Sequence, residues 1–266
     1  MKNVNYRTRP AAVAGMFYAA DSEQLSADVT HYLRQAQNHL NISPKAIIAP
    51  HAGHIYSAPV AASAYKLLEP EADKIKQVIL LGPSHRVAFR GIATPDTDFF
   101  ETPLGKIKIN KRNCEKAETL DFVQPSQLAH AEEHSLEVHL PFLQVLLNDF
   151  ELTPFVVGDC ERDDVAKLLE LFWGSDETLF IISTDLSHFH DYATATHRDR
   201  LTSNAIESIQ PEQISYEDAC GRAPLNGLLT LARHHRLNIK LLDLRNSGDT
   251  AGDKNRVVGY GAYAVY

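Results

Sequence analysis

The chain of 266 residues has few of the residues that cross-link or anchor a protein, with three cysteines, two methionines and one tryptophan. Cys114, Cys160 and Cys220 are too few and too irregularly spaced for a disulfide framework or a zinc ribbon. No stretch approaches the ~18 consecutive apolar residues that span a bilayer. Residues 1–24 carry only short apolar runs, unlike a secretory signal. We therefore expect a soluble, cytoplasmic protein in a reducing compartment.

Basic residues are scarce relative to acidic ones, 26 against 34, which gives a formal net charge of -8. A surface of this sign repels phosphate backbones and anionic lipids, so we expect neither nucleic-acid nor membrane binding. Hydrophobic residues make up 44% of the chain and charged residues 23%, which excludes a disordered or fibrous protein. The glycine motifs of nucleotide-binding loops and the Gly-x-Ser-x-Gly elbow are also missing, which argues against a nucleotide cofactor and an ordinary serine hydrolase.

Short apolar runs alternate with helical patterns along the chain. The runs at 46–49, 77–81, 152–157 and 179–182 are apolar at consecutive positions, as in strands buried on both faces. The pattern also predicts helices at about 22–36, 59–68, 135–147, 163–173, 198–208 and 224–234, a hairpin within 91–110, and closing strands at 239–244 and 257–266. Repeats and glycine-rich linkers are absent. We predict a single α/β domain over residues 1–266, with a mainly parallel or mixed central sheet and helices on both faces.

Four predicted strands are followed at once by polar residues that can bind a metal. These are His51, His85, Asp185 with His188, and Asp249. Ligands of open α/β sheets bind beyond the carboxyl ends of the strands, so these side chains can converge in one pocket. A single histidine after a strand is usually a capping or solvent-facing residue, but four such strand ends favour a shared site. Two imidazoles and a carboxylate form the usual site of non-haem Fe(II), and the same ligands can hold catalytic zinc.

Two further segments leave alternatives open. His134 either begins a helix whose acidic neighbours suit the helix dipole, or carries protons at the mouth of the pocket. Cys220, just before a predicted helix, is either a small packed residue or a thiolate favoured by the helix N-terminus.

Five blocks of residues occur in a fixed order along the chain. They are Ala-Pro-His-Ala-Gly at 49–53, Gly-Pro-Ser-His at 82–85, Glu-His-Ser-Leu-Glu-Val-His-Leu-Pro at 133–141, Ser-Thr-Asp-Leu-Ser-His at 183–188 and Cys-Gly-Arg at 220–222. They resemble the signature blocks of the Memo family, whose prokaryotic members are called AmmeMemoRadiSam system protein B. The resemblance covers nearly the whole chain and implies a fold like that of class III extradiol dioxygenases, which cleave catechol rings with Fe(II).

Carried onto this chain, the resemblance implies that His51 and His85 are metal ligands. It also places His134, Asp185 and His188 in the pocket, where His134 or His188 would move protons and Asp185 would orient His188. For the third ligand we expect Asp249, with Asp185 as the rival, because a carboxylate completes the two-histidine set. The expected metal is Fe(II), with zinc or copper as alternatives.

The expected function is therefore that of a metal-dependent, dioxygenase-like oxidoreductase whose substrate the sequence does not identify. Two alternatives stay open: a non-catalytic protein that binds a peptide or small ligand in the same pocket, and a metal-dependent hydrolase. The name of the prokaryotic family implies a functional association with a radical-SAM protein and an AMMECR1-domain protein.

Overall fold

Four parallel strands form the centre of the fold, each made by one of the apolar runs. The computed structural model describes residues 6–37, 40 and 42–266. Its central strands are β2 (Ala46–Ala49), β3 (Gln77–Pro83), β8 (Glu151–Val157) and β9 (Thr178–Ser183). They lie side by side in the order β2-β9-β3-β8, and nearly all their residues are buried. The four predicted strands are thereby confirmed.

Strands at both edges make this sheet mixed. On one side β12 (Val257–Val265) pairs antiparallel with β2, with β10 (His188–His190) and with β11 (Ile239–Asn246). On the other side β4 (Ile92–Thr94) pairs antiparallel with β8 and parallel with β7 (Val123–Pro125). A separate three-stranded sheet consists of β1 (Thr8–Arg9), β5 (Phe99–Thr102) and β6 (Gly105–Lys108).

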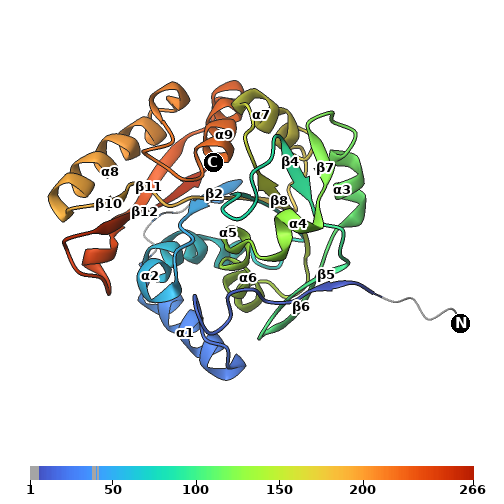
Figure 1. Ribbon diagram of the computed structural model, residues 1–266, viewed down its shortest axis with the longest axis horizontal. Coiled ribbons are helices and arrows are strands. Elements are labelled where there is room, and N and C mark those ends of the chain that lie inside the picture. The colour runs from blue at the N-terminus through green and yellow to red at the C-terminus, as the bar shows by residue number, and fades with distance from the viewer. Residues whose placement is uncertain (1–5, 38–39, 41) are drawn as a thin grey trace, which may run out of the picture.

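Helices cover both faces of the main sheet (Figure 1). One face carries α1 (Ser22–Gln35), α2 (His54–Tyr65), α5 (His134–Glu137) and α6 (Leu140–Leu146), and the other carries α7 (Arg162–Glu170), α8 (Tyr192–Glu207) and α9 (Arg222–His235). Neighbouring strand residues point to opposite faces, so Ile47 packs into the first core and Ile48 into the second. The structure thus confirms the predicted α/β class with three layers, and this arrangement is consistent with a dioxygenase-like fold.

Shorter elements complete the described chain. They are α3 (Lys111–Ala117), α4 (Gln127–Ala131), and the 3-10 turns η1 (Lys66–Glu71), η2 (Pro211–Gln213) and η3 (Ser247–Asp249). None of the helices among the described residues is both long enough and apolar enough to cross a membrane.

Four predicted elements differ from the observed ones, three of them for identifiable reasons. The helix expected at 59–68 is observed as α2, which begins five residues earlier at His54 and ends at Tyr65, where η1 follows. The helix expected at 135–147 is divided into α5 and α6, with Pro141 in the first turn of α6, where its missing amide N–H costs nothing. The helix expected from residue 198 begins earlier because Asp191 caps it, accepting from the amides of Ala193 and Thr194. The predicted hairpin is confined to β5 and β6, whereas β4 joins the main sheet.

Candidate metal centre

Three histidines from three segments meet at the carboxyl edge of the parallel strands. His51 follows β2, His85 follows β3 and His134 begins α5. Their ring centroids are 5.1 Å apart for His51 and His85, 5.7 Å for His51 and His134, and 4.5 Å for His85 and His134. One ring nitrogen of each lies within 4.8 Å of the other two, and no other such group of metal-binding side chains occurs among the described residues. We call these three residues the histidine cluster.

Two glycines let neighbouring segments close on this cluster. A Cβ atom on Gly82 of β3 would lie 2.7 Å from the hydroxyl oxygen of Ser135, so the glycine allows α5 to pack against the strand end. A Cβ atom on Gly221 would lie 2.5 Å from the carbonyl oxygen of Ser183. That glycine therefore brings the preceding Cys220 against the end of β9.

The hydrogen bonds of His51 determine which of its two ring nitrogens carries the proton and which carries the lone pair. The Ser183 hydroxyl donates to the Ser135 carbonyl at 2.6 Å, so it accepts a hydrogen bond from His51 Nδ1–H, also at 2.6 Å. His51 Nε2 then carries the lone pair. Burial and, to a lesser extent, the neighbouring imidazoles lower the pKa of His51 well below its ordinary value, which keeps the ring neutral. A neutral imidazole with one nitrogen hydrogen-bonded is the form that binds metals.

His85 is held in the same way by a buried carboxylate, Glu133. The two Glu133 oxygens accept from the His85 ring Nδ1 at 2.9 Å and from the His85 amide at 2.6 Å, and the Ser135 amide adds a third bond at 2.9 Å. Burial opposes ionisation of Glu133, but these hydrogen bonds and the His85 charge lower its pKa to about 2. A carboxylate on one nitrogen leaves His85 Nε2 free and makes it more basic toward a metal.

His134 completes the cluster against an aromatic wall. Its ring packs on Phe17 with centroids 4.8 Å apart. Burial and the nearby His85 lower the pKa of His134 to about 4, so the ring is neutral at pH 7. Its Nδ1 lies 3.5 Å from the Glu133 carboxylate and makes no hydrogen bond to any described residue. His134 therefore offers a lone pair, in addition to the proton-carrying role that the sequence suggested.

Asp185 and Cys220 support the His51 side of the cluster. The Asp185 carboxylate accepts from the His51 amide at 2.7 Å, and the Asp185 amide donates to the Cys220 sulfur at 3.3 Å. This sulfur lies 3.4 Å from His51 Nε2. Burial and the Asp185 charge raise the pKa of Cys220 to about 12, so the structure does not favour the thiolate that a helix N-terminus alone would stabilise.

Asp249, the expected third ligand, is not brought to the cluster. It lies exposed in η3, where its carboxylate accepts from the Asn246 amide at 3.0 Å and from the Tyr192 hydroxyl at 2.6 Å. The Asn246 side chain accepts in return from the backbone of η3, which makes a capping box. The carboxylate is therefore committed to closing its own turn. Of the residues that the sequence singled out, His134 is the one that lies with His51 and His85.

His188 lies at the margin of the site. Its Nδ1 bonds to the Leu186 carbonyl at 2.8 Å, which fixes the ring without help from Asp185. The charge of His188 opposes the rise that burial imposes on the pKa of Asp185. The charges of the two side chains therefore interact, but the hydrogen bond that orients the His188 ring is the one that it donates to the backbone carbonyl of Leu186.

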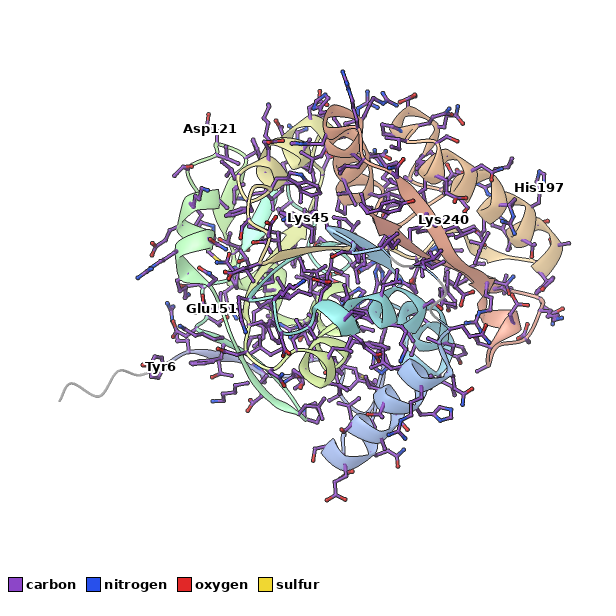
Figure 2. All side chains as sticks on the ribbon, turned by 180° about the vertical axis from the view of Figure 1, so that it is seen from behind. Tyr6, Lys45, Asp121, Glu151, His197 and Lys240 are labelled. Atoms are coloured by element: carbon purple, nitrogen blue, oxygen red, sulfur yellow. The ribbon has the colours of Figure 1, made fainter. Side chains whose placement is uncertain are left out.

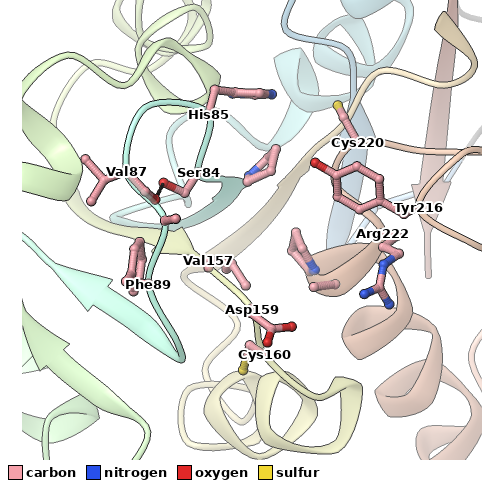
Figure 3. A pocket seen from close by; sticks show the side chains of 15 residues that line it. Ser84, His85, Val87, Phe89, Val157, Asp159, Cys160, Tyr216, Cys220 and Arg222 are labelled. Carbon is pink, nitrogen blue, oxygen red and sulfur yellow. Dashed lines mark hydrogen bonds between the residues drawn. The ribbon is translucent and has the colours of Figure 1, made fainter.

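A cavity of about 240 Å³ lies between His85 of the cluster and the start of α9 (Figure 3). His85 and Cys220 line one end of it and Asp159 and Cys160 the other. Arg222, the first residue of α9, lines the wall. The cavity therefore adjoins the histidine cluster through His85.

The sequence interpretation missed two contributors to this site, Glu133 and Ser183. Glu133 was assigned to a helix start, and it does cap α5, but the same carboxylate also holds His85. Its position next to His134 in the block at 133–141 could have indicated that Glu133 belongs to the site. Ser183 ends β9, where the polar residues 183–185 that follow the apolar run mark the same edge of the sheet.

An α/β domain with three imidazoles clustered at the carboxyl edge of its parallel strands defines a candidate metalloprotein. A family model described as "Memo-like protein" matches residues 9–264. A MEMO1 family protein of Aquifex aeolicus is 36% identical, over 96% of this chain and 97% of its own length. The similarity extends to "Protein MEMO1" of Xenopus laevis, 30% identical over 97% of each chain. The chain belongs to the Memo-like family.

Proposed function

We propose that the protein is a metal-dependent, dioxygenase-like oxidoreductase of the cytoplasm that uses Fe(II). The observation that carries the proposal is the histidine cluster, whose ring nitrogens lie within 4.8 Å of one another. His51, His85 and His134 would hold the metal, so His134 takes the third position that the sequence assigned to Asp249. The donor set fits a divalent transition metal, because three imidazoles bring their ring nitrogens together and the lowered pKa values of His51 and His134 keep these two rings neutral.

The bound metal would supply open coordination positions for oxygen and an organic substrate. Ser183 and Glu133 would fix the rings of His51 and His85 through their Nδ1 atoms. The substrate would occupy the adjoining cavity, which both polar and apolar side chains line. His188, at the margin of the site, would exchange protons with solvent.

A metal-dependent hydrolase is the second candidate, since three histidines also hold zinc in enzymes that activate water. Such an enzyme commonly needs a free carboxylate near the metal-bound water. Here Glu133 is committed to His85 and Ser135, and Asp185 to the His51 amide. Because these hydrogen bonds already occupy both carboxylates, we favour the oxidoreductase over the hydrolase.

The test uses protein loaded anaerobically with Fe(II) and, in parallel, with zinc. We expect one iron per chain, and oxygen uptake with catechols that requires the iron form. His51→Ala should lose both properties. His197→Ala is the matched control, because His197 lies exposed on α8 away from the cluster (Figure 2). Ester hydrolysis by the zinc form without oxygen uptake by the iron form would instead support the hydrolase, and absence of stoichiometric metal would support a binding protein.

A further inference from the structure

The wall of the cavity beside the histidine cluster carries a cation that has no anionic partner among the described residues. Arg222 is half-buried at the start of α9 and lines the cavity. Its guanidinium lies over the Tyr216 ring, 5.9 Å from the ring centroid. Among the described residues it makes no hydrogen bond or ion pair, unlike Arg9, which bonds to buried Glu137 at 2.6 Å. A half-buried guanidinium of this kind gains most from an anionic partner that also enters the cavity.

The backbone beside Arg222 adds to the positive potential. α9 has 14 residues, and its N-cap Gly221 supplies no side-chain cap. Pro224 has no amide N–H, and the Ala223 amide donates to no described acceptor. Both residues line the cavity. The positive end of the helix dipole, with one amide that has no described acceptor, therefore lies at the same wall of the cavity as Arg222.

The remaining walls decide what kind of anion fits. Val87, Phe89 and Val157 supply an apolar side. The volume of about 240 Å³ exceeds the ~150 Å³ in which a buried benzene ring is known to fit. The one anionic side chain among the lining residues, Asp159, forms no ion pair with Arg222 and lies at the end away from His85 (Figure 3). A single small ring bearing one anionic group matches these walls.

We propose, building on the proposed function, that the cavity accepts a small, mainly apolar ligand with one carboxylate or phosphate group, and that Arg222 binds this group. The anion lies on Arg222 and the Ala223 amide, and the apolar part of the ligand extends toward His85 and Cys220. Arg222 then determines specificity for anionic over neutral ligands. Asp159 weakens the binding of such ligands, because it places a like charge in the same cavity.

The experiment measures binding to the metal-free protein by calorimetry, so that coordination of the anion by a metal plays no part. Benzoate is compared with benzamide, its neutral counterpart, and phenyl phosphate with phenol. We expect the wild-type protein to prefer the anions by about ten- to hundredfold, the range of a charge-assisted hydrogen-bonded pair. Whichever anion shows the larger preference identifies the carboxylate or the phosphate as the natural group.

Two variants with opposite expected effects make the test specific. Arg222→Met should reduce the preference for benzoate to about onefold, while Asp159→Asn should tighten benzoate binding about three- to tenfold. A preference that persists in Arg222→Met, or that falls in Asp159→Asn, overturns the proposal. Iron content is measured on the same Arg222→Met preparation. Normal iron with lost preference supports both proposals, whereas an Arg222-dependent preference in a protein that never binds iron refutes only the metal-dependent function.

Discussion

Glu133 is the residue whose replacement tests the cluster most informatively. Its carboxylate accepts three hydrogen bonds, two from His85 and one from the Ser135 amide. In Glu133→Gln, the amide group keeps one acceptor oxygen and brings an NH2 group toward these donors. His85 then loses the anion that orients its ring, and metal affinity should fall about 10- to 100-fold, or about 1.4–2.7 kcal/mol.

The same substitution should change how stability depends on pH. The pKa of Glu133 is about 2 in the folded protein against an ordinary value of 4.5. A lowered pKa stabilises the folded state above pH 4.5, and this contribution disappears as the pH falls toward 2. The difference corresponds to roughly 3 kcal/mol at neutral pH. Glu133→Gln should therefore unfold more easily at pH 7 and depend less on pH between 4.5 and 2.

The assay is a competition titration of Fe(II) against a chelator, together with urea unfolding of the metal-free protein. Glu132→Gln is the matched control, because Glu132 is the adjacent carboxylate and is exposed. The control should bind iron like the wild type. If Glu133→Gln folds and binds iron within twofold of the wild type, the role assigned to the Glu133 carboxylate is wrong.

Three further changes test separate parts of the structure. Asp249→Asn should leave iron affinity within twofold of the wild type, because the Asp249 carboxylate bonds to the Asn246 amide within its own turn and to Tyr192. Loss of iron binding in a titration would show that Asp249 is a metal ligand. Burial lowers the pKa of His139 to about 3. Below pH 6.5 the imidazole of residue 139 is therefore protonated in the unfolded chain but not in the folded protein, and the free energy of unfolding should fall by up to about 1.4 kcal/mol per pH unit. In His139→Gln the free energy of unfolding, measured with urea at several pH values, should fall less steeply as the pH is lowered. An unchanged dependence on pH would contradict the lowered pKa of His139. Gly221→Ala should cost about 1–3 kcal/mol, because its Cβ would approach the Ser183 carbonyl to 2.5 Å, whereas Gly174→Ala, with no atom within 4 Å, should cost little in the same assay.

Much of the fold could be predicted because it depends on local pattern. The consecutive apolar residues of β2, β3, β8 and β9 indicate strands covered on both faces, and the polar residues that follow them mark the edge where a site forms. His51 and His85 were found in this way. The break between α5 and α6 was missed, although Pro141 was its visible cause.

The third position of the site could not be predicted from strand ends alone. His134 lies in the cluster because α5 packs closely against β3. This close packing is possible because residue 82 is a glycine, whose lack of a Cβ atom leaves room for Ser135. Asp249 had suitable chemistry and followed a strand, but a capping box within η3 uses its carboxylate. Such competition between local hydrogen bonds and a distant site appears only once the backbone is folded.

The central claim is that His51, His85 and His134 together bind one metal ion. Anomalous diffraction at the iron absorption edge, from crystals loaded anaerobically with Fe(II), tests this claim directly. We predict a single iron peak with a ring nitrogen of each histidine at roughly 2.1 Å, the usual length of a metal–imidazole bond. A peak bound by the Asp249 carboxylate without His134, or no peak near His51 and His85, would contradict it.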